Sequence, residues 1–456
     1  MERGRTVMNP RHDPNPLLTA LLAEADWTAA DLARAVNTLG TAHGLRLRYD
    51  RTSVAHWLNG SRPRPPVGEL VGQALSRRLG RTLTPLDTGL AEPDDAADAM
   101  AQLLRGDDPV QRLAALCRAD ADPARRAHLA RAVAPAAPAV LTHWDTRPPP
   151  LPPVTHGVRQ ATAADATRLE TAAVCGALMG ERYGGAHGRP ALTVYLCEDV
   201  VPLLTAPAHP SVRRALFTGA AQLTLLVAGR AAEVGHPGLA EHYYTLALEL
   251  AHAAGDRGSY AIVLRCLSVH THRLGDHHRA VALGEAALDV AGSAVPHATR
   301  AFVYAGRALV RAGAGQGRAS SGDLLAAERH LARATGPEGP FTSYPETALR
   351  YQRAEVLSRL GDHQGAAAEL EGSLAARPAD HHKARVLLHA RLAHTLLATH
   401  QVEAAVDQCH HVLRHHEQLA AGSVHGTVPR LLRELAPYER NPRVRAFRER
   451  LRAAPH

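Results

Sequence analysis

The second half of the chain repeats one pattern of residues, and this repeat restricts the possible folds more than any other feature. In each copy three residues stand at i, i+4 and i+7, mostly small, large and small, and in four copies a glycine precedes the first by five residues. This spacing puts the three residues on one helix face, and the glycine suits a tight turn between antiparallel helices. The copies begin at Gly235, Gly275, Gly322, Gly361 and Thr399, and their alanine anchors are Ala240, Ala280, Ala327, Ala366 and Ala404.

The anchors are 40, 47, 39 and 38 residues apart, and an apolar helical pattern precedes each copy. The expected first helices cover residues 216–234, 260–274, 299–312, 346–360 and 383–397. A helix pair cannot bury its apolar face alone, so neighbouring pairs must stack into a right-handed superhelix with a concave groove. Residues 154–208 are expected to cap its N-terminal end. The sequence therefore predicts an all-α fold that ends in a helical-repeat superhelix.

The N-terminal part predicts four further helices, at residues 17–24, 29–36, 51–59 and 67–79. The third of these is the most informative. Asp50 can cap it, Gly60 can end it, and Val54, Trp57 and Leu58 share one face, so we expect that face to pack inward. Trp57 is expected in the core and not as a base-stacking residue. The side chains left facing outward are Arg51, Thr52, Ser53 and His56.

Together with Ala30-Asp31-Leu32-Ala33 upstream and Arg62-Pro63 downstream, this segment resembles a phage-repressor-type (XRE) helix-turn-helix domain. The resemblance implies that residues 1–90 bind DNA. It places Arg51, Thr52, Ser53 and His56 at base edges, and Arg62 and Arg64 on phosphates. The sequence departs from the family in one respect, because residues 37–49 replace a very short turn before the recognition helix. Arg46 and Arg48 in this interval are candidates for extra phosphate contacts.

The repeats resemble the second helix of tetratricopeptide (TPR) repeats, with the best match over residues 235–250 and 361–378. Their period exceeds the 34 residues of that family, so the array is TPR-like. Combined with the XRE-like domain, it resembles a group of transcriptional regulators from high-GC Gram-positive bacteria. In TPR proteins the first helix of each pair lines the concave surface. Two of these helices carry a basic, aromatic stripe that is a candidate site for an acidic peptide or small anion. The alternative is that this face is simply solvated. The stripe comprises Arg265, His272, Arg300, Tyr304, Arg307 and Arg311.

Residues 91–153 separate the two parts. The segment begins with acidic residues and ends in Pro148-Pro149-Pro150 and Pro152-Pro153, which predicts a helical connector followed by a stiff proline-rich linker. The expected organisation is thus a helix-turn-helix domain at 1–90, a connector at 91–153 and a TPR-like array at 154–456.

Composition agrees with an intracellular binding protein. The formal charge of +8 favours an anionic partner, although a general arginine bias gives the same charge. Five scattered cysteines without a C-x-x-C pair indicate reduced thiols in a cytoplasm. The most apolar run, residues 215–229, is shorter than the roughly 20 residues that cross a bilayer, so we expect no membrane association.

Motifs for catalysis are missing from the sequence. It contains no G-x-S-x-G, no H-E-x-x-H and no phosphate-binding G-x-x-x-x-G-K-[ST]. His411 and His415 have the i, i+4 spacing of a metal site, but no second pair stands nearby, and we expect the 29 histidines to face solvent. The sequence therefore predicts no catalytic residue, no metal and no cofactor, and hence a protein that is not an enzyme.

These inferences lead to one functional prediction and one alternative. The chain is predicted to be a cytoplasmic transcriptional regulator that binds double-stranded DNA, with a TPR-like array that forms a homodimer or senses a peptide, protein or small molecule. Alternatively, it is a protein-interaction scaffold whose N-terminal domain keeps the fold but no longer binds DNA. The long 37–49 interval favours the alternative, and the polar outer face of the 51–59 helix favours the first.

Overall fold

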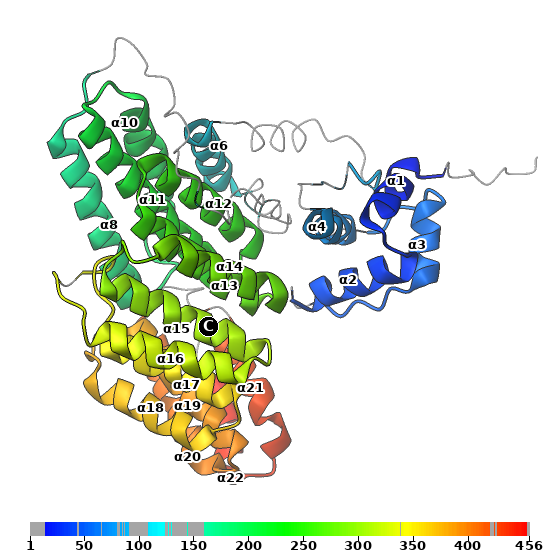
Figure 1. The fold of residues 1–456 in the computed structure, drawn as a ribbon. Helices are drawn as coiled ribbons and strands as arrows, with labels where there is room; N and C mark the ends of the chain where they lie inside the picture. Colours follow the sequence, from blue (N-terminus) through cyan, green and yellow to red (C-terminus); the bar gives the residue numbers. More distant parts are fainter. Residues whose placement is uncertain are drawn as a thin grey trace, which may run out of the picture. The chain divides into compact units, whose positions relative to one another are not determined.

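The computed structural model is all-α, as the sequence predicts: its described residues form helices and no strand (Figure 1). It describes residues 14–42, 45–64, 66–79, 83, 85, 87–90, 108–123, 126, 129, 144, 159–337, 339–419, 424 and 426–453. The chain forms two compact units, one made of residues 1–103 with 131–139 and the other of 104–130 with 140–456. The proline run expected to form the linker, at 148–153, lies outside the described residues.

The N-terminal unit contains α1 (Pro16–Ala25), α2 (Ala29–Ala42), α3 (Arg51–Leu58) and α4 (Val67–Leu79). All four helices stand where the sequence predicts them, but α2 continues six residues beyond the expected end at Val36. Leu39 explains the extension, because it continues the apolar face of α2 and is buried in the common core. The core joins one face of each helix, and its most buried members include Leu18, Leu32, Val54 and Leu75.

The second unit begins with helices that precede the repeats. They are α6 (Pro109–Ala121), α8 (Ala163–Tyr183), α9 (Arg189–Tyr195), the π-helical turn η2 (Leu196–Val200) and α10 (Val201–Thr205). Helices α8 to α10 occupy the region that we expected to cap the array, and α8 packs on its first helix. Helix α6 lies in the segment expected to be a connector, yet it packs against α9 and against a repeat helix.

Five antiparallel helix pairs follow, each with its two helices packed together (Figure 1). They are α11 (Pro210–Glu233) with α12 (Pro237–Ala254), α13 (Arg257–Arg273) with α14 (His277–Ala291), α15 (His297–Gly313) with α16 (Gly317–Leu331), α17 (Glu346–Arg359) with α18 (His363–Ala376), and α19 (His382–Ala398) with α20 (Val402–His416). The helices α21 (Thr427–Leu435), η3 (Ala436–Tyr438) and α22 (Pro442–Ala453) complete the described fold.

The predicted register of the repeat is confirmed in three copies. Ala240, Ala280 and Ala366 are each the fourth residue of a second helix and are fully buried. The glycines five residues before them have φ angles of 83°, 87° and 88°, in the left-handed region where a Cβ atom is unfavourable.

The predicted register is wrong in the other two copies. In the third, the turn residue is Gly315, with φ 77°, and the equivalent of the alanine anchor is the fully buried Ser320. Ala327, the predicted anchor, lies seven residues further along the same buried face, which explains the misalignment. In the fifth copy the turn is at His400, with φ 60°, and the buried anchor is Ala405, one residue after the prediction.

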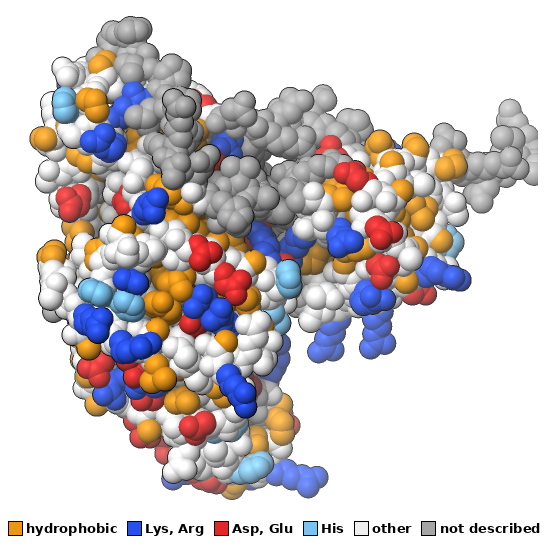
Figure 2. All heavy atoms as spheres, viewed as in Figure 1, with side chains coloured by type: hydrophobic (Ala, Val, Ile, Leu, Met, Phe, Trp, Pro, Cys, Tyr) orange, Lys and Arg blue, Asp and Glu red, His pale blue; other side chains and the backbone are white. Residues whose placement is uncertain are grey.

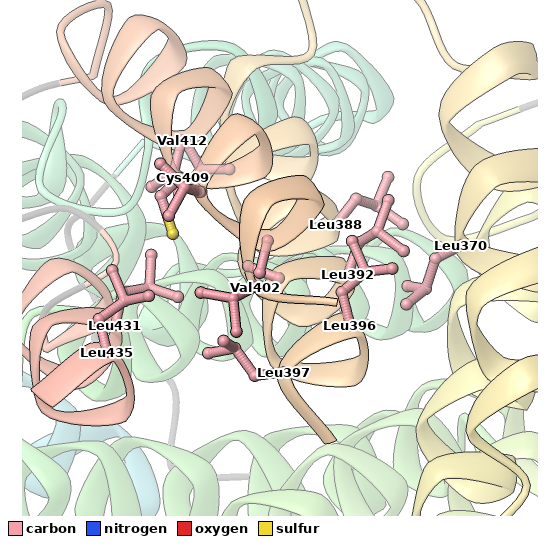
Figure 3. Packing of buried hydrophobic residues seen from close by; sticks show 14 of the residues in the cluster. Leu370, Leu388, Leu392, Leu396, Leu397, Val402, Cys409, Val412, Leu431 and Leu435 are labelled. Atoms are coloured by element: carbon pink, nitrogen blue, oxygen red, sulfur yellow. The ribbon is translucent and has the colours of Figure 1, made fainter. Parts of the chain in front are cut away.

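The apolar core of the last two pairs continues into the C-terminal helices (Figure 3). Leu388 and Leu392 of α19 face Leu370 of α18 on one side of the helix, as the figure shows. Cys409 of α20 lies on the other side of this core, with the α21 residue Leu431. Because each layer contacts the next, the repeat core needs α21 and α22 to cover its end.

Helix α11 is the described helix that has the length and composition to cross a membrane. With 24 residues, the helix extends beyond the apolar run at 215–229 on both sides. However, 67% of its most apolar 18-residue window is buried inside the array. Such burial is typical of a core helix in a soluble protein.

Candidate functional site

The N-terminal end of α3 is fixed by a reciprocal cap. The carboxylate of Asp50 accepts hydrogen bonds from the backbone N–H of Ser53 at 2.8 Å and from its hydroxyl at 2.8 Å. The backbone hydrogen bond is the largest cause that lowers the pKa of Asp50, so the cap holds a carboxylate. Ser53 was predicted at a base edge, but in this structure its hydroxyl donates to Asp50.

The two faces of α3 divide as predicted. Val54 is fully buried, and Trp57 retains 4% of its exposure and packs edge-on against Tyr49, with ring centroids 5.1 Å apart. Arg51, Thr52 and His56 are exposed on the other side. Because the buried face is committed to the core, the exposed side chains remain available to a ligand.

The segment between α2 and α3 is held against the core and is not a simple turn. The side-chain amide of Asn37 donates to the backbone oxygen of Tyr49 at 2.8 Å and accepts from its N–H at 2.9 Å. Leu47 lies over Gly40, where an added Cβ would come within 2.4 Å of its Cδ1. This clamp was not predicted. The residue in the sequence that could have indicated the clamp is Asn37, because it is a polar residue with two hydrogen-bonding groups beside an otherwise apolar helix face.

In the segment that this clamp holds before α3, half-buried and exposed side chains alternate regularly. Leu45, Leu47 and Tyr49 pack against the core, whereas Arg46 and Arg48 between them are exposed. Six exposed arginine or histidine side chains thus belong to α3 and the segments that flank it: Arg46, Arg48, Arg51, His56, Arg62 and Arg64. In Figure 2 blue side chains project from the side of the N-terminal unit where α2 and α3 lie.

In the repeat array, two members of the predicted anion-binding stripe have carboxylate partners. The guanidinium of Arg307 donates to both carboxylate oxygens of Asp323, at 2.9 and 2.6 Å. Arg311 donates to Asp323 at 3.0 Å and to Glu285 at 3.1 Å. Asp323 retains only 4% of its exposure, so its two ion pairs join α15 to α16 within the fold.

Two further members of the stripe lie in aromatic or histidine contacts, and a third is half-buried. Tyr304 stacks on His330, with centroids 5.4 Å apart and planes inclined by 14°. His272 is buried, its Nδ1 lies 3.0 Å from Nδ1 of His277, and burial lowers its pKa to about 4. Arg300 is half-buried on the first turn of α15. The stripe therefore does not form one continuous open surface of cations.

Arg265, the last member, has different surroundings. Its guanidinium donates to Oε1 of Gln352 on α17 at 2.9 Å and lies over the ring of Phe302, 4.0 Å from the centroid. No carboxylate forms a salt bridge with Arg265 among the described residues.

A buried polar cluster joins α6 to the array, and it was not predicted. The carboxylate of Asp120 accepts from Arg189 at 2.8 and 2.7 Å, from the hydroxyl of Tyr243 at 3.0 Å and from Arg126 at 3.0 Å. Burial raises the pKa of Tyr243 well above its ordinary value, so this hydroxyl remains a donor. Arg189 and Tyr243 are far from Asp120 in sequence, so no local pattern could reveal these contacts. The cluster explains why α6 belongs to the second unit.

The histidines are less exposed than predicted. His389 retains 5% of its exposure and stacks on His411 and His415, with centroids 4.7 and 5.7 Å apart. His270 and His272 are also buried. In the part of the chain that the structure describes, no group of three or more histidine, cysteine, aspartate or glutamate side chains could hold a metal ion.

Residues 18–91 match the family model of the SP15 N-terminal domain. The match runs from Leu18 in α1 to residue 91, past the end of α4 at Leu79, so it covers the core helices of the N-terminal unit. No curated protein matches the chain.

Proposed function

We propose that this protein is an XRE-like transcriptional regulator that binds double-stranded DNA through α3 and its flanking segments. The observation that carries the proposal is the exposure of Arg51, Thr52 and His56 on a capped helix whose opposite face is buried. A helix with this division can enter the major groove with its first turns at base edges.

The flanking segments supply the charges that a DNA backbone requires. Arg46 and Arg48 precede α3, and Arg62 and Arg64 follow it, all with exposed side chains. The clamp by Asn37 holds the preceding segment, which lowers the entropy cost of placing its arginines on phosphates. Asp50 is the opposing feature, because its carboxylate repels phosphate oxygens; its position in the cap directs it to backbone N–H groups instead.

In this proposal the TPR-like array forms a homodimer or receives a signal from an effector, and the protein works in the cytoplasm. All five cysteines are free thiols, and Cys175 is exposed, which suits a reducing compartment.

The test is a titration of the full-length protein against fluorescent duplex DNA at about 50 and 200 mM salt. If the four flanking arginines neutralise phosphates, affinity should fall on the order of a hundredfold between these conditions. Charge-neutral variants of Arg48 and Arg64 should reduce the salt dependence. A protein that binds no duplex at either salt concentration would instead support the scaffold function.

The scaffold function is retained as a second candidate because of the connection between α2 and α3. Even with the longer α2, eight residues separate Ala42 from Arg51, in place of the short turn of the XRE family. The array would then carry the function alone.

A further inference from the structure

Arg265 is an inward-facing arginine without a compensating acid. Two other arginines of the stripe, Arg307 and Arg311, show the usual solution, because both contact Asp323. Arg265 instead donates to Gln352, which is neutral, and the described residues offer it no salt bridge. A guanidinium that is partly removed from water without an anion is unfavourable, so its retention calls for a separate reason.

The backbone of α15 is shaped around this arginine. A Cβ atom added to Gly306 would lie 2.5 Å from Nε of Arg265 and 2.6 Å from its Cγ, so any side chain at this position would displace the guanidinium. Through this gap Arg265 extends from α13 past α15 to reach α17. Phe302, one turn earlier on α15, supports the guanidinium plane through its ring.

Two hydrogen-bond donors at this point have no acceptor. Nε of Arg265 is buried and unpartnered, and so is Nε2 of Gln352. Gln352 retains only 6% of its exposure, and its Oε1 is already occupied by Arg265, so the amide presents its NH₂ group to the site. Buried donors without partners are uncommon in folded proteins, and each calls for an explanation such as an acceptor that a ligand supplies.

We propose that Arg265 and Gln352 bind the carboxylate of a small organic acid, one oxygen accepting from Nε of Arg265 and the other from Nε2 of Gln352. This inference rests on the proposed function and names the class of its effector. One positive charge and a neutral amide suit a planar monoanion with two oxygens better than a phosphate, which carries more charge and needs more donors.

The surroundings of the two donors select an acid with an apolar body. The ring of Phe302 contacts Tyr344 edge-on, with centroids 5.3 Å apart, and Tyr344 is 7% exposed. Both rings belong to the same small core with Ala301 and Leu349. A short aliphatic or aromatic chain would extend along these apolar groups while its carboxylate meets the donors.

The experiment measures the thermal unfolding of the full-length protein with hexanoate and benzoate, with their primary amides and with inorganic phosphate. The two acids should raise the melting temperature and saturate, whereas the amides and phosphate should leave it unchanged. Arg265→Met should abolish the response to the acids. It should leave the melting temperature of the unliganded protein unchanged or higher, since the variant removes an uncompensated charge while keeping apolar volume.

Arg279→Met is the matched control, because Arg279 contacts Glu241 at 3.1 Å on the second helices of the array. This variant should melt at a lower temperature and still respond to the acids. The proposal is overturned if neither acid shifts the melting temperature, if the amides act like the acids, or if Arg265→Met still responds. DNA binding is measured separately by the titration above, so an acid response in a protein that binds no DNA would reject the proposed function alone.

Discussion

Lys383, on the first turns of α19, places its Nζ 2.9 Å from Oε2 of Glu233, at the end of α11. It thereby joins the last helix pair to the first. Glu181 of α8 lies 3.7 Å from the same nitrogen, and Glu233 also accepts from the backbone N–H of Gly185 at 2.6 Å. Lys383 is the only lysine in the chain. The last helix pair is thus linked to the first pair and to α8 through one ammonium group and two carboxylates.

Replacing this ammonium should weaken the whole second unit. Lys383→Met leaves Glu233, whose side chain is 10% exposed, without its cation, and we expect the free energy of unfolding to fall by about 3 kcal/mol. Urea denaturation followed by circular dichroism measures this change. Lys383→Arg keeps the charge and should retain most of the stability. Equal midpoints for Lys383→Met and the unchanged protein would show that the contact contributes nothing to closure.

The same contact predicts the reactivity of the lysine. Burial alone would lower the pKa of Lys383, but the charges of Glu233 and Glu181 raise it above its ordinary value. Amine reagents attack the neutral amine, so Glu233→Gln should lower this pKa and speed the labelling of Lys383 at mildly alkaline pH. Timed acetylation followed by peptide mass spectrometry measures the rate of labelling at this single lysine. Glu198→Gln, at an exposed position on η2, is the control and should label at the original rate.

The sequence was sufficient to predict the helices and most of the repeat, because those depend on local spacing. Gly235 with Ala240 and Gly361 with Ala366 follow a rule that operates within one turn and one helix. The third copy shows the limit of this reasoning. Ala327 satisfies the same periodicity as Ser320, and only the position of the turn at Gly315 decides between them.

The candidate site was predicted only where one helix defines it. The inward and outward faces of α3 follow from the spacing of Val54 and Trp57. In contrast, the carboxylate partner of Arg307 and the amide partner of Arg265 depend on how separate helices meet. Both pairings are tertiary contacts, and helical periodicity alone cannot predict which residues form them.

Buried histidines should make the protein sensitive to acid. Burial is the largest cause that lowers the pKa of His389 to about 4, opposed by its hydrogen bond to Gln408 at 2.8 Å and reinforced by the charges of His411, Arg385 and Arg414. The unfolded chain takes up this proton near pH 6.5. Between pH 6.5 and 4 the unfolded state therefore binds a proton that the folded state excludes, and stability falls as the pH falls, by up to roughly 1.4 kcal/mol per pH unit.

His389→Gln removes this titration and keeps a polar side chain beside Gln408. The loss of stability between pH 6.5 and 4 should become shallower than in the unchanged protein, while His270 and His272 continue to contribute their own dependence. Denaturation midpoints at half-unit pH intervals give the slope. His278→Gln, at an exposed position on α14, controls for the loss of a histidine as such. An unchanged slope for His389→Gln would mean that the pKa of His389 is the same in the folded and the unfolded protein.

The DNA-binding proposal separates the roles of Arg51 and Arg64. Arg51 is exposed on the first turn of α3, where a recognition helix meets base edges, whereas Arg64 lies beyond the helix and should meet a phosphate. Arg51→Ala should cost roughly 1–3 kcal/mol on a selected site and relax the preference at one base pair.

Arg64→Ala should weaken binding to selected and random duplexes alike and reduce the slope of affinity against salt by about one. Both variants act on exposed side chains, so neither should change the melting temperature of the N-terminal unit. Selection of bound sequences from a random pool, followed by titration at several salt concentrations, measures both effects. If the two variants lose affinity equally on selected and random DNA, α3 does not read bases, and the arginines act only as a non-specific phosphate surface.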